Sequence, residues 1–377
     1  MRRPSAAIAA LALLLGVALA RPAVAGDAPP VPAAPGGPVA PRGPAPAAPA
    51  KAAPAKMTAD ELEKRLFEHP GAAVAMAGLK YGTALAGLVV LVLLLVRRRD
   101  ERRGLVPALR PPATPPRPFS IWSGLGLAAV AMAGGGFLGG FAYVALRDPG
   151  PTDGSMPLEW HIGSTAAGSI PVAVVIAFAI HRAWARRRAG DASEVAEAVF
   201  GDGTVRPSAA ATSSPAFAAL PTVAWPARAA WRAGIGGFCV ASLLVLVVSA
   251  LTVVAMNMLG MPAEPQDLVL RVVEPKAAYE PWLIAGFGVL VAPVTEEYVF
   301  RGMLYPAFRD GSSPLVGALV SSVIFGAIHA SFTAGPALFV LAFLLCRLYE
   351  RTGSVWPGVL VHALNNATSL LPLFLLR

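Results

Sequence analysis

The chain has few charged residues: only 14% of its 377 residues are Asp, Glu, Lys or Arg, whereas 55% are hydrophobic. Its mean hydropathy is +0.60. This balance, with several long apolar runs, excludes an ordinary soluble domain and is typical of a membrane protein that crosses the bilayer several times. The net charge of +9 is almost all arginine and lies between the apolar runs. It therefore indicates topology rather than nucleic-acid binding.

Cysteine and the common cofactor motifs are also scarce. Cys239 and Cys346 are the only cysteines, and both lie in apolar runs. They support neither a disulfide framework nor a cysteine metal cluster. The sequence has no GxxxxGK[ST] loop, no GxGxxG in a strand context and no HExxH helix. These absences argue against a nucleotide-binding protein and against an ordinary zinc protease.

The N-terminal part reads as a targeting segment and a tether. Residues 1–25 have the basic start, apolar centre and small-residue cleavage site of a secretory signal peptide, with an uncleaved anchor as the alternative. Residues 26–56 are nearly all Ala, Pro and Gly, so we expect a disordered tether. Thr58 and Glu61 form a capping box that predicts a short amphipathic helix ending before Pro70.

The fold class is predicted to be an all-α, polytopic membrane bundle with about eight transmembrane helices after the signal peptide. Arginine clusters follow alternate apolar runs, which by the positive-inside rule predicts a bacterial-type inner (plasma) membrane protein with its mature N-terminus outside. We divide it into a three-helix N-terminal region, residues 57–229, and a catalytic membrane domain, residues 230–377. The predicted spans are about 72–96, 119–146, 163–183, 231–259, 282–308, 314–332, 335–350 and 354–376.

Two adjacent acids interrupt the fifth predicted span. Ionisable groups at bilayer depth cost roughly 2.5–3.5 kcal/mol each on insertion scales, so Glu296 and Glu297 indicate a functional site. Glu297 and Arg301 are four residues apart and share a helix face, so they can pair. Glu296 points about 100° away from Glu297. We interpret Glu297 and Arg301 as structural support and Glu296 as the reactive carboxylate. The alternative is that both acids belong to one salt-bridge cluster between helices.

Three other polar side chains lie at a similar predicted depth. At about 1.5 Å per residue, Glu296 and Asn366 are roughly 18 Å above the cytoplasmic ends of their spans. His362 is roughly 12 Å and His329 roughly 22 Å above the ends of theirs. His362 and Asn366 are four residues apart and face the same way, whereas Asn365 is turned away and is our second choice. A carboxylate, two imidazoles and an amide at one depth suggest a catalytic constellation.

The residue types indicate hydrolysis without a covalent intermediate. A carboxylate desolvated in the bilayer, here Glu296, can exchange protons with water, and His329 can help orient that water. His362 and Asn366 can donate hydrogen bonds to an oxyanion. A zinc site is the other interpretation, with Glu296, His329 and His362 as ligands and water in the fourth position. The residues alone leave both open.

Three motifs in this order resemble those of CPBP (CAAX protease and bacteriocin-processing, or Abi) membrane proteins. Residues 296–302, Glu-Glu-Tyr-Val-Phe-Arg-Gly, resemble the EExxxRG motif. Residues 325–329, Phe-Gly-Ala-Ile-His, resemble FxxxH, and residues 362–366, His-Ala-Leu-Asn-Asn, resemble HxxxN. Residues 351–357, just before the last motif, are also typical. The resemblance covers roughly residues 230–377.

The resemblance implies an intramembrane endopeptidase. Glu296 and His329 would activate water, and His362 and Asn366 would form the oxyanion site. It does not settle the metal, because the family is often named as metalloproteases while its eukaryotic prenyl-protease relatives are regarded as glutamate-dependent.

Our main hypothesis is therefore hydrolysis of a peptide bond in a membrane-associated protein or peptide, with that substrate and the lipid bilayer as the partners. The alternatives are a non-catalytic membrane scaffold or bacteriocin-immunity-type protein that binds a peptide in the same cavity, and a proton-coupled transporter. Against the transporter, the chain shows no internal repeats.

Overall fold

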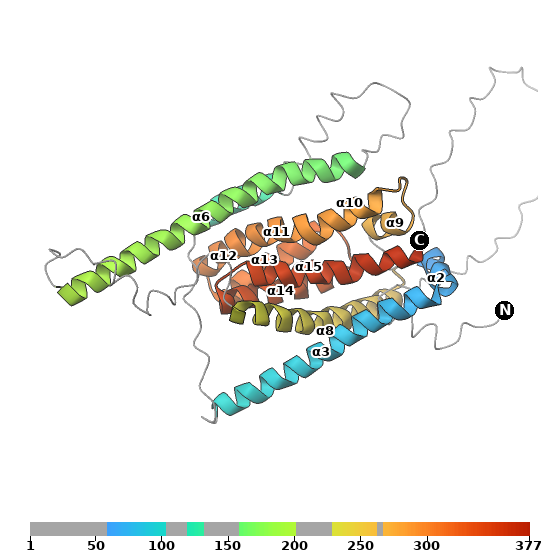
Figure 1. The fold of residues 1–377 in the computed structure, drawn as a ribbon, viewed down its shortest axis with the longest axis horizontal. Coiled ribbons are helices and arrows are strands. Elements are labelled where there is room, and N and C mark those ends of the chain that lie inside the picture. The colour runs from blue at the N-terminus through green and yellow to red at the C-terminus, as the bar shows by residue number, and fades with distance from the viewer. Residues whose placement is uncertain (1–58, 103–118, 132–157, 201–227, 262–266) are drawn as a thin grey trace, which may run out of the picture.

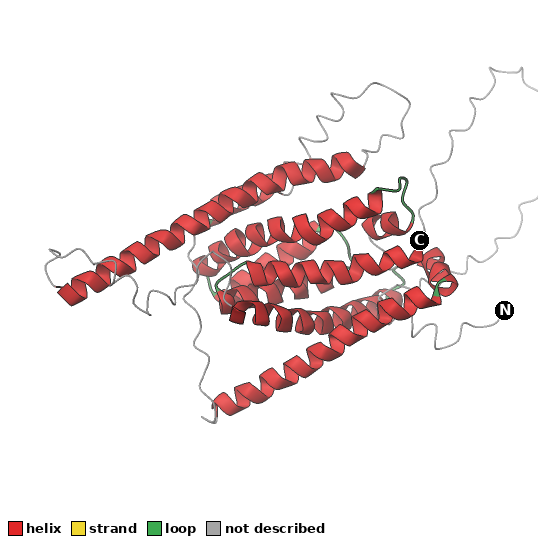
Figure 2. Cartoon of the chain, viewed as in Figure 1, coloured by secondary structure: helices red, strands yellow, loops and turns green. Residues whose placement is uncertain are grey.

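The computed structural model describes residues 59–102, 119–131, 158–200, 228–261 and 267–377. Within these residues every regular element is a helix and no strand occurs (Figure 2), which confirms the all-α prediction. The predicted signal peptide, the tether and most of the second predicted span lie outside the described residues. The elements are α2 Ala59–Glu68, α3 Pro70–Arg102, α4 Ile121–Ala129, α6 Leu158–Phe200, α8 Arg228–Met258, α9 Asp267–Val273, α10 Glu280–Gly286, η2 Phe287–Val291, α11 Ala292–Glu297, η3 Tyr298–Leu304, α12 Tyr305–Gly311, α13 Pro314–Ile328, α14 Gly335–Thr352, α15 Trp356–Leu370 and η4 Leu371–Leu376.

In the described part of the chain, 5 helices are long and apolar enough to cross a membrane: Pro70–Asp100, Leu158–Ala183, Ala230–Met258, Glu280–Gly311 and Trp356–Leu376. They confirm a membrane protein with several spans. The predicted spans 314–332 and 335–350 form a hairpin of α13 and α14, in which α13 has only 15 residues. A helix of that length reaches about 22 Å, less than the hydrocarbon core of a typical bilayer, which is about 30 Å thick.

The most buried of these five helices runs from Glu280 to Gly311, and we call it the central helix. In Figure 1, α6 and α3 lie along opposite flanks, with α8, α13, α14 and α15 between them. α3 packs on α8, which packs on α14 and α15, while α6 and α4 pack on η3. The C-terminal ends of α3 and α6, the N-terminal end of α8 and the α12–α13 turn gather at the left of Figure 1. That end collects the segments predicted to be cytoplasmic, and its orientation in a membrane stays a prediction.

The central helix is interrupted by two π segments, η2 and η3. Each π segment stops just before a proline, Pro293 or Pro306, at the start of the next α-helical piece. Proline has no backbone N–H, so it cannot continue the main-chain hydrogen-bond ladder. A π segment widens the turn and is a known way to place an interruption inside a long helix. The chain therefore passes through the bundle as one helix with two local defects.

Two apolar clusters hold the bundle around this helix. One surrounds η3 and includes Phe300, Met303, Tyr305 and Phe325. The other lies where α2, α9, α10 and η4 meet, and it includes Leu66, Val272, Ile284, Leu373 and Leu376. Ion pairs border the second cluster, with Arg65 2.6 Å from Glu274 and Arg271 2.8 Å from Glu280.

Gly87 sets the distance between α3 and α8. A Cβ atom at this position would lie 2.0 Å from the carbonyl oxygen of Cys239, which is too close for any side chain. Small residues at such positions let membrane helices approach closely and gain van der Waals contact. Gly82, five residues earlier on α3, has nothing within 4 Å of an added Cβ. Both glycines lie on α3, but only Gly87 is in close contact with another helix.

We predict that Gly87→Ala destabilises the protein by about 1–3 kcal/mol, because α3 must move away from the α8 backbone. Gly82→Ala is the control, and it should be neutral or stabilising by up to about 1 kcal/mol through helix propensity. Thermal unfolding of both variants in the same detergent measures the difference. Equal midpoints for the two variants would contradict the close approach of α3 and α8.

Candidate active site

The predicted pair of Glu297 and Arg301 is present and fully enclosed. The two side chains are 0% and 1% exposed, and Arg301 Nη1 donates to Glu297 Oε1 at 2.7 Å. Arg301 Nη2 donates to the carbonyl oxygen of Ala342 on α14 at 3.1 Å. The four-residue spacing thus produces the pairing expected from the sequence. The pair also connects η3 to a neighbouring helix, so its removal would disturb more than one element.

Glu297 also contacts the histidine of the last helix. Its Oε1 lies 3.1 Å from His362 Nδ1. Its other oxygen, Oε2, lies against Gly358, where a Cβ atom would come within 2.8 Å of it. Gly358 and His362 are one turn apart on α15, so the glycine makes the room that lets Glu297 reach the imidazole. The preferred sequence interpretation paired Glu297 only with Arg301, whereas this second contact matches the alternative, in which the acids belong to a cluster of charged side chains between helices.

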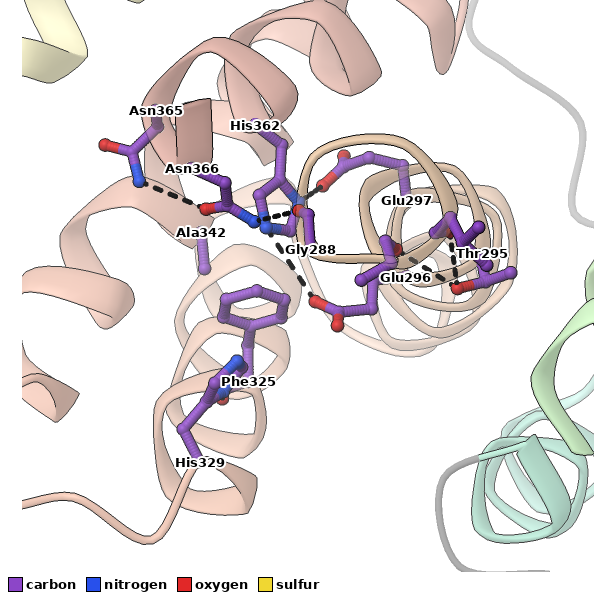
Figure 3. A network of polar contacts seen from close by, with 12 residues as sticks. Gly288, Thr295, Glu296, Glu297, Phe325, His329, Ala342, His362, Asn365 and Asn366 are labelled. Atoms are coloured by element: carbon purple, nitrogen blue, oxygen red, sulfur yellow. Dashed lines mark hydrogen bonds and ion pairs between the residues drawn. The ribbon is translucent and has the colours of Figure 1, made fainter. Parts of the chain in front are cut away.

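Glu296 faces the other nitrogen of the same imidazole. Its Oε2 lies 3.8 Å from His362 Nε2, and its side chain is 19% exposed (Figure 3). This oxygen is buried and has no hydrogen-bond partner within the described residues. A separation of 3.8 Å is longer than a hydrogen bond. The carboxylate therefore directs an oxygen without a hydrogen-bond partner toward His362.

Phe325 lies between the two histidines. Its ring centroid is 4.8 Å from that of His329 and 5.7 Å from that of His362, and the Arg301 guanidinium carbon lies 4.9 Å from it. His329 follows the last residue of α13, and its Nδ1 lies 2.7 Å from the Phe325 carbonyl oxygen. Figure 3 shows His329 on the side of Phe325 away from His362. A shared water between His329 and Glu296 stays a prediction.

Asn366 is held by backbone and by a neighbouring amide. Its Nδ2 donates to the carbonyl oxygen of Gly288 in η2 at 2.8 Å, and Asn365 Nδ2 donates to Asn366 Oδ1 at 3.5 Å. A side-chain amide carries two N–H donors, so one remains after the bond to Gly288. The predicted second choice, Asn365, thus supports Asn366. The predicted role of Asn366 at an oxyanion is not tested by these contacts.

A family model described as "Type II CAAX prenyl endopeptidase Rce1-like" matches residues 278–368. This range contains the two glutamates, both histidines and the asparagine of the site. The chain therefore carries an Rce1-like domain. The resemblance to CPBP proteases is confirmed on this stretch.

One curated protein is similar to part of this chain. A Bacillus subtilis (strain 168) protein described as "Putative membrane peptidase YdiL" is 31% identical over 77 residues, which are 20% of this chain and 32% of that protein. The match thus spans about a third of the length of that relative. No solved structure matches the chain significantly.

The residues of the Rce1-like domain do not fit the zinc interpretation. Within the described parts of the chain, no group of three His, Cys, Asp or Glu side chains could hold a metal ion. Phe325 stands between His329 and His362, so the two imidazoles do not face a common point. A tetrahedral zinc site needs its ligand atoms to converge on one point about 2 Å away.

We predict that Glu297→Gln destabilises the Rce1-like domain by about 3–5 kcal/mol, because it leaves the Arg301 guanidinium buried without a counter-charge. Glu297→Gln with Arg301→Met should recover part of that loss, since the double variant buries no charge. Thermal unfolding in detergent measures both effects.

The control is Glu350→Gln. It removes one acidic partner of Arg309, 2.9 Å away, but leaves the other, Asp310, at 2.6 Å. It should cost about 1 kcal/mol or less. An unfolding midpoint for Glu297→Gln equal to that of the control would show that the enclosed ion pair contributes no more to stability than the pair of Arg309 and Glu350.

Proposed function

We propose that this protein is an intramembrane endopeptidase that cleaves a peptide bond in a membrane-associated protein or peptide. The match of residues 278–368 to the Rce1-like family model supports a CAAX-protease-type hydrolase, and the apolar helices support a multi-pass membrane protein. The observation that carries the finer proposal is the buried, unpartnered oxygen of Glu296 directed at His362. We also propose an inner-membrane location with the N-terminus outside, from the arginine distribution.

In the proposed reaction Glu296 acts as the general base. Its free oxygen takes a proton from a water molecule, and the resulting hydroxide attacks the carbonyl carbon of the scissile bond. The carbonyl oxygen becomes an oxyanion in a tetrahedral intermediate. Glu296 then returns the proton to the amide nitrogen as the carbon–nitrogen bond breaks. No covalent intermediate with the protein is formed, and one water is consumed for each bond cleaved.

The neighbouring side chains bind and orient the reacting groups. His362 donates from Nδ1 to Glu297 and, when it is protonated, from Nε2 to the oxyanion. Asn366 adds the second donor through the N–H that Gly288 does not occupy. His329 has its Nδ1 against the Phe325 carbonyl, which leaves Nε2 to orient the water. Glu297 and Arg301 hold His362 in place.

We predict that Glu296→Gln lowers cleavage by at least about 100-fold, since general-base catalysis typically contributes that much or more. Membrane proteomes of a deletion strain, a wild-type strain and a Glu296→Gln strain would identify the substrate, and purified protein would then be assayed on it. Glu68→Gln, on an exposed part of α2, is the control and should retain full activity.

The same comparison separates the competing function. A peptide-binding scaffold or immunity-type protein would produce a phenotype that survives Glu296→Gln and is lost only in the deletion strain. Undiminished cleavage by purified Glu296→Gln protein would overturn the proposed mechanism.

We predict that the metal chelator 1,10-phenanthroline leaves the cleavage rate unchanged, because the proposed water is activated by Glu296 without a metal ligand set. The rate is measured on the substrate found above, with a zinc protease treated in parallel as a positive control. A loss of activity that added Zn²⁺ restores would contradict the metal-free reaction.

A further inference from the structure

The first π segment leaves one carbonyl oxygen without its main-chain donor. In η2 the backbone N–H of Ala292 donates to the carbonyl of Phe287, five residues earlier. In the same register, the next donor would be residue 293 and its acceptor would be Gly288. Residue 293 is proline, which has no N–H. The carbonyl of Gly288 therefore loses the bond that this register would supply.

A side chain from another helix supplies the missing donor. Asn366 Nδ2 on α15 donates to the Gly288 carbonyl oxygen at 2.8 Å (Figure 3). α15 packs directly on η2. The approach is close, because a Cβ atom at position 288 would lie 3.0 Å from Leu370 Cδ1. Asn366 thus takes the place that a backbone N–H would hold in an uninterrupted helix.

We propose that Pro293 is a positioning residue that acts through Asn366. By withholding an N–H, Pro293 keeps the Gly288 carbonyl available to hold the Asn366 amide. Asn365 Nδ2 lies 3.5 Å from the Oδ1 of that amide, a much weaker contact than the one to Gly288. Because the amide group is planar, the 2.8 Å bond to Gly288 sets the direction of the remaining N–H of Asn366. This inference rests on the proposed function, in which that N–H binds the oxyanion.

Pro306 offers a matched comparison on the same helix. The second π segment, η3, ends in the same way: Tyr305 N–H donates to the Phe300 carbonyl, and Pro306 follows. The carbonyl left by that proline is the backbone oxygen of Arg301, not the partner of Asn366. Pro306→Ala therefore makes the same chemical change as Pro293→Ala without offering a new donor to Gly288.

The first test is a cycle of melting temperatures in detergent for the wild type, Pro293→Ala, Asn366→Ala and the double variant. In the wild-type background, Asn366→Ala leaves the Gly288 carbonyl without a donor and should lower the midpoint by a few degrees. In the Pro293→Ala background the new N–H can take over, so Asn366→Ala should cost less than half as much. Equal losses in both backgrounds would overturn the proposal, as non-interacting sites are additive.

The second test follows cleavage of a fluorescence-quenched peptide that ends in an S-farnesylated CAAX sequence. Pro293→Ala should lower kcat at least about tenfold with little change in KM, because only the transition-state donor is misplaced. Pro306→Ala should keep the wild-type rate, and the double variant should be no slower than Asn366→Ala alone. A wild-type rate for Pro293→Ala, or an equal loss in Pro306→Ala, would refute the positioning role.

The two tests separate this inference from the proposed function. If Glu296→Gln cleaves the peptide as fast as the wild type, the proposed function fails, whatever the proline variants do. If Glu296→Gln is inactive but the melting cycle is additive, the proposed function stands and the role of Pro293 falls. The melting cycle needs no substrate, so it decides the hydrogen-bond exchange even if the farnesylated peptide is not cleaved.

Discussion

The ion pair of Glu297 and Arg301 is the interaction on which the site depends. It is almost completely excluded from solvent, and it joins the central helix to α14 through Ala342 and to α15 through His362. A buried charge with several partners has few alternative positions, since leaving any partner exposes an uncompensated charge. The conformation of η3 is therefore restrained at this point. Because Glu296 precedes Glu297, the same restraint fixes the direction of its side chain, which faces Nε2 of His362.

Much of this arrangement follows from sequence because charged residues in an apolar chain are conspicuous. The spacing of Glu297 and Arg301 predicted their pairing, which the structure confirms. Similar depths in three spans predicted that Glu296, His329, His362 and Asn366 would converge. Glu296 does face His362 at 3.8 Å, whereas His329 lies on the far side of Phe325 from His362. Gly358 and Phe325 were not assigned these roles. Gly358 acts by lacking a side chain, and Phe325 acts as a spacer between imidazoles, which apolar periodicity cannot distinguish from ordinary packing.

The central helix shows why backbone roles are harder to predict. A proline inside a helical run indicates a kink, but it does not say which carbonyl loses its partner, because that depends on whether the local register is α or π. Here the π register selects Gly288, and the selection can be recognised only once Ala292 is seen to bond five residues back. The end of α13 is similar: its apolar run continues past Ile328, yet the helix stops at His329 and Ala330 turns with φ at +47°.

The shortness of α13 bears on how water would reach the site in the proposed hydrolysis. The α13–α14 connection, with Phe332 83% exposed, stops short of a full bilayer crossing and contains non-helical backbone. Some of its polar groups are satisfied locally, as when Ser331 accepts from the N–H groups of Ala334 and Gly335. Hydrocarbon cannot satisfy the remainder, so such backbone is tolerated only against protein or water. We therefore expect water to reach deeper beside His329 than it would next to a full-length membrane crossing.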